Sequence, residues 1–202
     1  MDAVLVDSDP AAEPIGRPRA RLAPWIAAMV AVVLVAFIVV LATRKPASER
    51  AVSSQLIGKR VPAFTGTTLT GETYDIDARR GKFVVVNFFA TWCVPCRLEH
   101  PELVKFSERH KQIGDAEVVS LAFDDSPDNI RTFFAEAGGD WPVIADGTGS
   151  TILDFGVSGV PESYVVAPNG QVIAKFLGVT DAALEGLLQR YDTPSAAETG
   201  AG

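Results

Sequence analysis

The feature that most limits what this chain can fold into is an apolar run that leads directly into a pair of cysteines. Cys93 and Cys96 are the only cysteines among 202 residues, and two positions separate them. Residues 83–89 are rich in β-branched and aromatic side chains, which is typical of a strand buried on both faces of a sheet. Residues 97–106 carry apolar side chains at helical spacing. A strand, then C-x-x-C, then a helix indicates a redox-active dithiol.

The two cysteines are expected to have different roles. Thiol–disulfide exchange needs a thiolate, and an ordinary cysteine is only a few per cent ionised at neutral pH. Cys93 stands where the helix is expected to begin, so unpaired backbone N–H groups and the helix dipole favour its ionised form. Pro95 suits the first turn, where no backbone N–H is needed. We therefore expect Cys93 to attack and Cys96 to resolve, closing a Cys93–Cys96 disulfide.

Half of a zinc site is the alternative interpretation of the cysteine pair. Zinc needs four ligands, and the remaining candidates, His100 and His110, lie on the same predicted helix. We therefore predict no metal and no cofactor, and a metal-binding tether is the non-enzymatic alternative. A thiol peroxidase is a further alternative. Its active site needs a Thr-x-x-Cys motif, and Thr91 stands one residue too close to Cys93.

Glu99 is a candidate acid–base residue. It follows Cys96 by three positions, so its side chain projects from the same side of the helix. One interpretation is a solvated surface carboxylate, the usual fate of a glutamate. The other is a carboxylate near the buried sulfur that accepts its proton during resolution, and that also raises thiol pKa values when ionised. The residues alone leave both interpretations open.

Val160 and Pro161 precede another apolar segment. A proline there is expected at the first position of a strand or in a special turn. The peptide bond between the two residues can be cis, and spacing alone does not decide this. Glu162, the next residue, is by default a surface acid.

The remaining segments predict an alternating α/β domain. The expected order is strand, helix, strand, helix, an insertion, then two strands and a helix, preceded by a short hairpin around Thr70 and Gly71. The expected strands are 61–66, 67–74, 83–89, 117–123, 141–145, 159–167 and 171–177, and the expected helices are 94–112, 126–138, 148–155 and 181–191.

An uncharged run near the N-terminus predicts a membrane anchor. From Leu22 to Thr43 the chain has 22 residues without a charge. As a helix this run would be about 33 Å long, enough for a hydrocarbon core of roughly 30 Å. A cleaved signal peptide is the competing interpretation, but its apolar region is usually shorter and ends in a small-residue cleavage site. We predict an uncleaved anchor at 21–43.

The anchor sets the remaining boundaries. Residues 1–20 are predicted to be a disordered tail, 44–58 a polar linker, 59–192 the folded domain and 193–202 a second disordered tail. Charges flank the anchor on both sides, so the redox motif decides the orientation. We expect a single-pass protein of the cell membrane with a cytoplasmic N-terminus and an extracytoplasmic C-terminal domain.

The charge balance limits the partners. The chain carries 25 acidic and 18 basic residues, for a net charge of −7. From residue 51 onward there are 20 acidic and 12 basic residues. An acidic domain without a basic patch is not expected to bind nucleic acid.

Together these motifs resemble those of the thioredoxin fold, and more narrowly the membrane-anchored TlpA/ResA/CcmG (DsbE) group. The resemblance covers residues 55–190. It is carried by Asn87-Phe88-Phe89-Ala90-Thr91-Trp92-Cys93, Cys96-Arg97-Leu98-Glu99-His100-Pro101, the insertion with Trp141-Pro142 and Asp146, and Gly159-Val160-Pro161-Glu162-Ser163.

The resemblance implies an α/β protein with a thioredoxin fold, in which helices flank a central mixed sheet. An N-terminal β-hairpin extension, a TlpA-type insertion and one preceding transmembrane helix complete the expected architecture. It implies an active-site acid at Glu99, a cis-proline loop at Pro161 and, for the CcmG-like members, a functional acid at Glu162. Trp92, Pro95, Val160 and Glu162 are then expected to bind the client.

The resemblance also implies partners. Proteins of this group act as disulfide reductases of apocytochrome c in cytochrome c maturation, and a CcdA- or DsbD-like membrane protein reduces them again. Disulfide exchange on another extracytoplasmic client, in copper-site assembly or general oxidative folding, is the alternative. Val94 departs from the residue of several relatives between the cysteines, which leaves the redox potential open.

Overall fold

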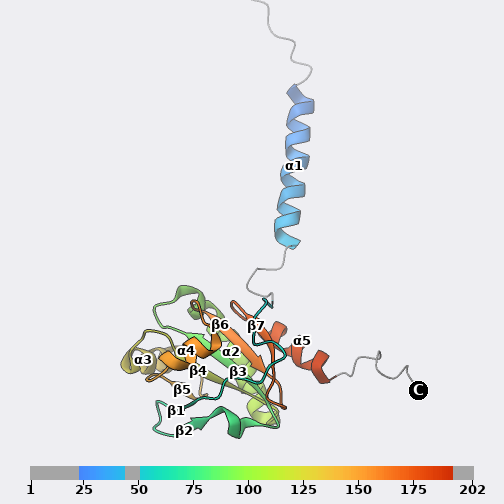
Figure 1. Ribbon diagram of the computed structural model, residues 1–202. Coiled ribbons are helices and arrows are strands. Elements are labelled where there is room, and N and C mark those ends of the chain that lie inside the picture. The colour runs from blue at the N-terminus through green and yellow to red at the C-terminus, as the bar shows by residue number, and fades with distance from the viewer. Residues whose placement is uncertain (1–22, 44–50, 193–202) are drawn as a thin grey trace, which may run out of the picture. The chain divides into compact units, whose positions relative to one another are not determined.

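The computed structural model describes residues 23–43 and 51–192, which belong to two separate units, 1–45 and 46–202 (Figure 1). The predicted tails and the first part of the predicted linker lie outside the described residues. The first unit contains helix α1 (Ala23–Thr43). Within the described residues, no helix combines the length and the apolarity that crossing a membrane requires.

The second unit is built around a five-stranded mixed sheet (Figure 1). Its strand order is β5-β4-β3-β6-β7, in which β3, β4 and β5 run parallel and β6 and β7 run antiparallel to their neighbours. The strands are β3 (Phe83–Phe89), β4 (Ala116–Ala122), β5 (Val143–Ile144), β6 (Glu162–Val166) and β7 (Val172–Phe176). The helices are α2 (Val94–Ile113), α3 (Pro127–Ala137), α4 (Gly149–Phe155) and α5 (Asp181–Asp192). This arrangement confirms the predicted central mixed sheet flanked by helices.

The central strand β3 is apolar throughout because both of its faces are covered. All seven of its residues are buried. Successive side chains of a strand point to opposite faces, so Val85 packs among the residues of α2, α3 and α5, and Val86 packs against α4 and the N-terminal part of the domain. The strand therefore holds the segment that follows it, residues 90–93, at a fixed place on the sheet.

The element boundaries confirm most of the sequence-based expectations, with three differences. The expected strand 141–145 is reduced to β5, which has two residues. The expected strand 159–167 begins only at Glu162, because residues 158–161 form a separate loop. The expected hairpin is shorter than predicted and consists of β1 (Thr65–Thr67) and β2 (Thr73–Asp75). The hairpin contacts the sheet through a bridge between Thr68 and Ile144 on β5.

The segment that enters the domain pairs with the opposite sheet edge. Ala51 and Ile57 form bridges to Phe176 and Val172 of β7, and the Val52 N–H donates to the Lys175 carbonyl at 2.8 Å. The described part of the predicted linker thus lies along β7, and the domain makes its first contacts upstream of residue 59. An edge covered in this way cannot pair with another chain.

Candidate active site

The cysteines lie at the junction of β3 and α2. Cys93 is the N-cap residue of α2, and its Sγ accepts a hydrogen bond from the Cys96 N–H at 3.2 Å. Pro95 occupies the first turn, where its missing N–H leaves no gap in the helix. Both cysteines are buried and are joined to each other as a disulfide. The unpaired N–H groups of the helix therefore point at the Cys93 sulfur, as the sequence indicates.

The loop before β6 contacts the Cys93 sulfur. The peptide bond between Val160 and Pro161 is cis, and the Val160 carbonyl oxygen lies 3.6 Å from Cys93 Sγ. The loop leads into β6, which pairs directly with β3. Two neighbouring strands thus bring the dithiol and the proline loop together.

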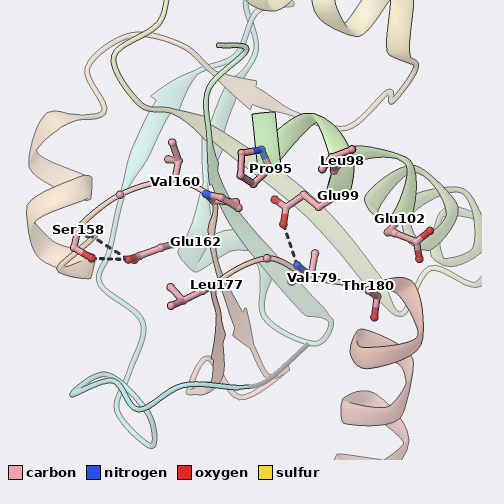
Figure 2. A pocket seen from close by; sticks show the side chains of 13 residues that line it. Pro95, Leu98, Glu99, Glu102, Ser158, Val160, Glu162, Leu177, Val179 and Thr180 are labelled. Atoms are coloured by element: carbon pink, nitrogen blue, oxygen red, sulfur yellow. Dashed lines mark hydrogen bonds between the residues drawn. The ribbon is translucent and has the colours of Figure 1, made fainter. Parts of the chain in front are cut away.

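Glu99 is buried, and its carboxylate accepts hydrogen bonds from two neutral donors. The Asn87 amide donates to Oε1 at 3.0 Å. The Val179 N–H donates to Oε2 at 2.9 Å (Figure 2). Burial raises the pKa of Glu99 to about 7, although the two hydrogen bonds act in the opposite direction. Glu99 is therefore placed to exchange a proton near neutral pH, and the surface interpretation of this residue is wrong.

Glu162 is not the surface acid that a lone glutamate suggests. Its side chain is 2% exposed, and Oε2 forms an ion pair with the Lys175 ammonium at 2.9 Å. The Ser158 hydroxyl donates to Oε1 at 2.9 Å and the Tyr164 hydroxyl to Oε2 at 3.3 Å. Burial lowers the pKa of Lys175, but its contacts with Tyr164 and Glu162 outweigh burial, so the net pKa is raised. Glu162 thereby ties the start of the proline loop, through Ser158, to the sheet.

Both acids line one cavity of about 540 Å³ beside the dithiol. Figure 2 shows Glu99 reaching from α2 toward the loop that follows β7, and Glu162 reaching toward Ser158 from the other side. The cavity is lined by Pro95, Leu98, Glu99, Glu102, Ser158, Gly159, Val160, Pro161, Glu162, Leu177, Gly178, Val179 and Thr180. The wall is largely apolar, and the side chain of Leu98 at its rim is exposed. Such a cavity suits an apolar polypeptide segment next to a disulfide.

The turn that carries Cys93 is held by a carboxylate which the sequence analysis did not single out. Asp125 Oδ2 accepts the Thr91 N–H at 2.5 Å and the Thr91 hydroxyl at 2.6 Å. Burial raises the pKa of Asp125, but hydrogen bonds from Thr91, Ser126 and Asn129 outweigh it and lower the net pKa. Trp92, the next residue, is exposed, and its indole N–H donates to the Asp124 carbonyl at 3.0 Å.

The structure brings most of the predicted site residues together. Pro95, Glu99, Val160, Pro161 and Glu162 line the cavity, whereas Trp92 lies outside its lining on the turn before Cys93. The sequence analysis missed Asn87, Asp125, Ser158 and Lys175. The signal for Asn87 was available, because it is the only polar residue in the apolar run 83–89.

The two histidines make other contacts. His100 Nε2 lies 2.9 Å from the Gly138 carbonyl, and its ring packs against Phe133 and Trp141. His110 lies between two carboxylates, with Nδ1 2.6 Å from Asp115 and Nε2 2.9 Å from Glu185.

Comparisons with known proteins agree with this geometry. The profile of the Redoxin family matches residues 56–189. The thiol:disulfide interchange protein HelX of Rhodobacter capsulatus is 38% identical over 131 residues, which cover 63% of this chain and 72% of HelX. The thiol-disulfide oxidoreductase ResA of Bacillus thuringiensis is 32% identical over 135 residues, which cover 66% of this chain and 78% of ResA.

Solved structures support the same fold. A thiol:disulfide interchange protein of the thioredoxin family from Chlorobium tepidum superimposes with a TM-score of 0.60 at 26% identity, covering 69% of this chain and 98% of that protein. A DsbF homologue from Corynebacterium diphtheriae gives a TM-score of 0.60 at 27% identity, covering 65% of this chain and 86% of that homologue.

Proposed function

The chain belongs to the Redoxin family and is a thiol–disulfide oxidoreductase, and from this premise we propose that it is a membrane-anchored disulfide reductase acting on an extracytoplasmic client. The proposal rests above all on one observation. A disulfide-forming pair at a helix N-terminus lies against a cis-proline loop, and one helical turn further along the helix stands a buried acid whose pKa is about 7.

The proposed reaction transfers two electrons to the client. In the reduced enzyme the Cys93 thiolate attacks a client disulfide, and one client sulfur leaves as a thiolate that takes a proton from water. Cys96 then loses its proton and attacks Cys93 Sγ, which releases the second client thiolate and closes the Cys93–Cys96 disulfide. The disulfide in the structure corresponds to the enzyme after this step.

Glu99 is proposed to take the proton of Cys96 in the second step. It lies one helical turn beyond Cys96. A carboxylate with a pKa of about 7 is substantially ionised at neutral pH, yet it still holds a proton well enough to return it. Cys93 needs no such partner, because its thiolate is stabilised by the N-terminus of α2.

Apocytochrome c is the proposed client. The resemblance to the TlpA/ResA/CcmG group supports this client, while the names of the relatives record thiol–disulfide chemistry alone. The C-x-x-C-H site of a c-type cytochrome must be reduced before it reacts with haem. A CcdA- or DsbD-like membrane protein is the proposed electron donor. A copper-site cysteine pair or another folding protein is the competing client.

The anchor and the location are supported by the sequence. The uncharged run from Leu22 to Thr43 extends past the part of α1 whose side chains are described, and it is long enough for a bilayer core. We place the N-terminus in the cytoplasm and the domain outside. Protease added to spheroplasts should degrade the domain, and its resistance until the cells are lysed would reverse the orientation.

Trapping tests both the chemistry and the client. With Cys96→Ser in the full-length protein, mixed disulfides with clients should accumulate in vivo, and with Cys93→Ser they should not. Mass spectrometry of the trapped species should identify apocytochrome c. Equal trapping by both variants would refute the assignment of roles.

A reduction potential near −120 mV, the value for the oxidant DsbA, would refute the reductase direction, because thioredoxin lies near −270 mV.

A further inference from the structure

A chain of four buried polar side chains connects the insertion with Glu99. The Trp141 indole N–H donates to Ser120 Oγ at 2.8 Å, and the Ser120 hydroxyl donates to Asn87 Oδ1 at 3.2 Å. The Asn87 amide then donates to Glu99 Oε1 at 3.0 Å. All four residues are at most 7% exposed. We call these four residues the relay.

The sheet places the members of the relay side by side. Asn87 on the central strand β3 stands opposite Ser120 on β4 and opposite Ser163 on β6. Its amide nitrogen has two hydrogens, and it donates one to Glu99 and the other to Ser163 Oγ at 3.1 Å. Every hydrogen-bonding position of this buried amide nitrogen is therefore used, and its oxygen accepts from Ser120.

The relay has one direction, and Trp141 sets it. An indole N–H can only donate, so Ser120 Oγ must accept from it. The hydroxyl hydrogen of Ser120 is then directed at Asn87 Oδ1. This contact fixes which end of the Asn87 amide faces Glu99. With the amide reversed, its oxygen would face Glu99 Oε1, and no hydrogen would lie between these two oxygens.

We propose that Trp141 is a positioning residue for Glu99, which acts through Ser120 and Asn87 by fixing the direction in which the relay donates. The inference rests on the proposed function, because it gives a role to the acid that exchanges the proton of Cys96. It also gives the insertion a part in the chemistry, since Trp141 lies between α3 and β5, away from the lining of the active-site cavity.

Other groups also face Glu99 and are independent of the relay. The Val179 N–H on the loop after β7 donates to its second oxygen. Glu102 lies one turn further along α2, and Glu162, which is paired with Lys175, lines the opposite wall of the cavity. Cys93 and Cys96 precede Glu99 on the same helix. The experiment must therefore change the relay while these groups stay in place.

The relay predicts the direction of a measurable shift. Donation from Asn87 stabilises the ionised form of Glu99, and a hydrogen bond is stronger when its donor is itself polarised by another. Removing the indole N–H should therefore weaken the last bond and raise the pKa of Glu99. We expect a rise of roughly 0.3 to 0.6 pH unit for Trp141→Phe.

The experiment is a titration of the glutamate carboxyl carbons by NMR in the full-length oxidised protein labelled with ¹³C-glutamate. Cysteines in a disulfide do not titrate, so the dithiol does not contribute to the titration of Glu99. Glu99→Gln identifies the Glu99 signal by removing it. Trp141→Phe and Ser120→Ala should both raise this midpoint. The double variant should match Ser120→Ala alone, because Trp141 acts only through Ser120.

Phe134→Leu is the matched control for packing. The Phe134 ring packs against Trp141 at 5.3 Å between centroids but takes no part in the relay. It should leave the midpoint unchanged. An unchanged midpoint in Trp141→Phe, an equal shift in Phe134→Leu, or additive shifts in the double variant would each refute the proposal.

The same variants separate this inference from the proposed function. If Glu99→Gln resolves mixed disulfides as fast as the unmodified protein at every pH, the proposed role of Glu99 is wrong. The midpoint shift in Trp141→Phe would still test the relay. If the rate of mixed-disulfide resolution depends on Glu99, but the titration midpoint of Glu99 is the same in Trp141→Phe as in the unmodified protein, only the relay is wrong.

Discussion

Two glutamates stand on opposite walls of the same cavity, and they are stabilised in different ways. Glu99 and Glu162 are both buried, at 7% and 2% exposure. Glu99 is held by two neutral donors, the Asn87 amide and the Val179 N–H. Glu162 is paired with the Lys175 ammonium. Burial alone does not decide what a carboxylate does; the charge of its partner does.

Because their partners differ in charge, the two acids are expected to have different roles. Without a cation, burial raises the pKa of Glu99 to about 7, which suits proton exchange with a thiol. With a cation, Glu162 serves as a fixed acceptor that holds Ser158 at the start of the cis-proline loop. We propose that Glu99 exchanges protons with the dithiol and that Glu162 holds the loop in place.

The largest expected effect comes from making Glu162 resemble Glu99. Lys175→Met keeps the length of the side chain but removes the cation, which leaves a buried carboxylate without a compensating charge. Removing one partner of a buried ion pair costs about 3 to 5 kcal/mol. Urea unfolding at pH 7 measures this loss in unfolding free energy.

The control for this prediction removes both charges. Glu162→Gln combined with Lys175→Met should recover part of the loss, because no uncompensated charge is then buried. A double variant that is as unstable as Lys175→Met alone would mean that the ion pair contributes packing only, and the comparison between the two acids would fail.

The second effect has the opposite sign. The pKa of Glu99 is raised from 4.5 to about 7, so the folded state binds the proton more tightly and stability falls as pH rises from 4.5 to 7. A shift of this size corresponds to about 3 kcal/mol. Glu99→Gln cannot ionise, but its amide nitrogen cannot accept one of the two hydrogen bonds that Glu99 accepts. The variant should therefore be less stable than the unmodified protein near pH 4, and its stability relative to that protein should rise by about 3 kcal/mol between pH 4 and pH 8. A relative stability that is the same at both pH values in urea unfolding would contradict this prediction.

A third carboxylate shows that burial, rather than neutral donors, raises the pKa of Glu99. Asp125 is also held by neutral donors, but it is only partly buried and its pKa is lowered. Stability should therefore fall as pH falls through the lowered pKa. Asp125→Asn should cost about 1 kcal/mol at pH 7, because it weakens both bonds to Thr91. Asp128→Asn, an exposed acid on α3, is the control in urea unfolding and should change stability little.

The sequence predicts which segments form the site better than it predicts the surroundings of the two buried acids. The cysteines, the helix that follows them and the proline loop were predictable, because each depends on local signals such as spacing, an apolar run or a proline. The environment of Glu99 and Glu162 was not, because Asn87, Val179 and Lys175 reach the two acids from distant parts of the chain. Burial of an acid is a property of the packed sheet, and a lone glutamate carries no local sign of its partners.

Glu102 gives the smallest expected effect and tests how far the comparison extends. It lines the same cavity one turn beyond Glu99, but it is partly exposed, and hydrogen bonds from Lys105 and the Asp181 N–H lower its pKa. Glu102→Gln should therefore change the unfolding free energy by about 0.5 kcal/mol or less. The midpoint of the Glu99 carboxyl titration should also stay unchanged in this variant. A shift of that midpoint comparable to that of Trp141→Phe would mean that charge along α2, rather than burial and the relay, sets the proton affinity of Glu99.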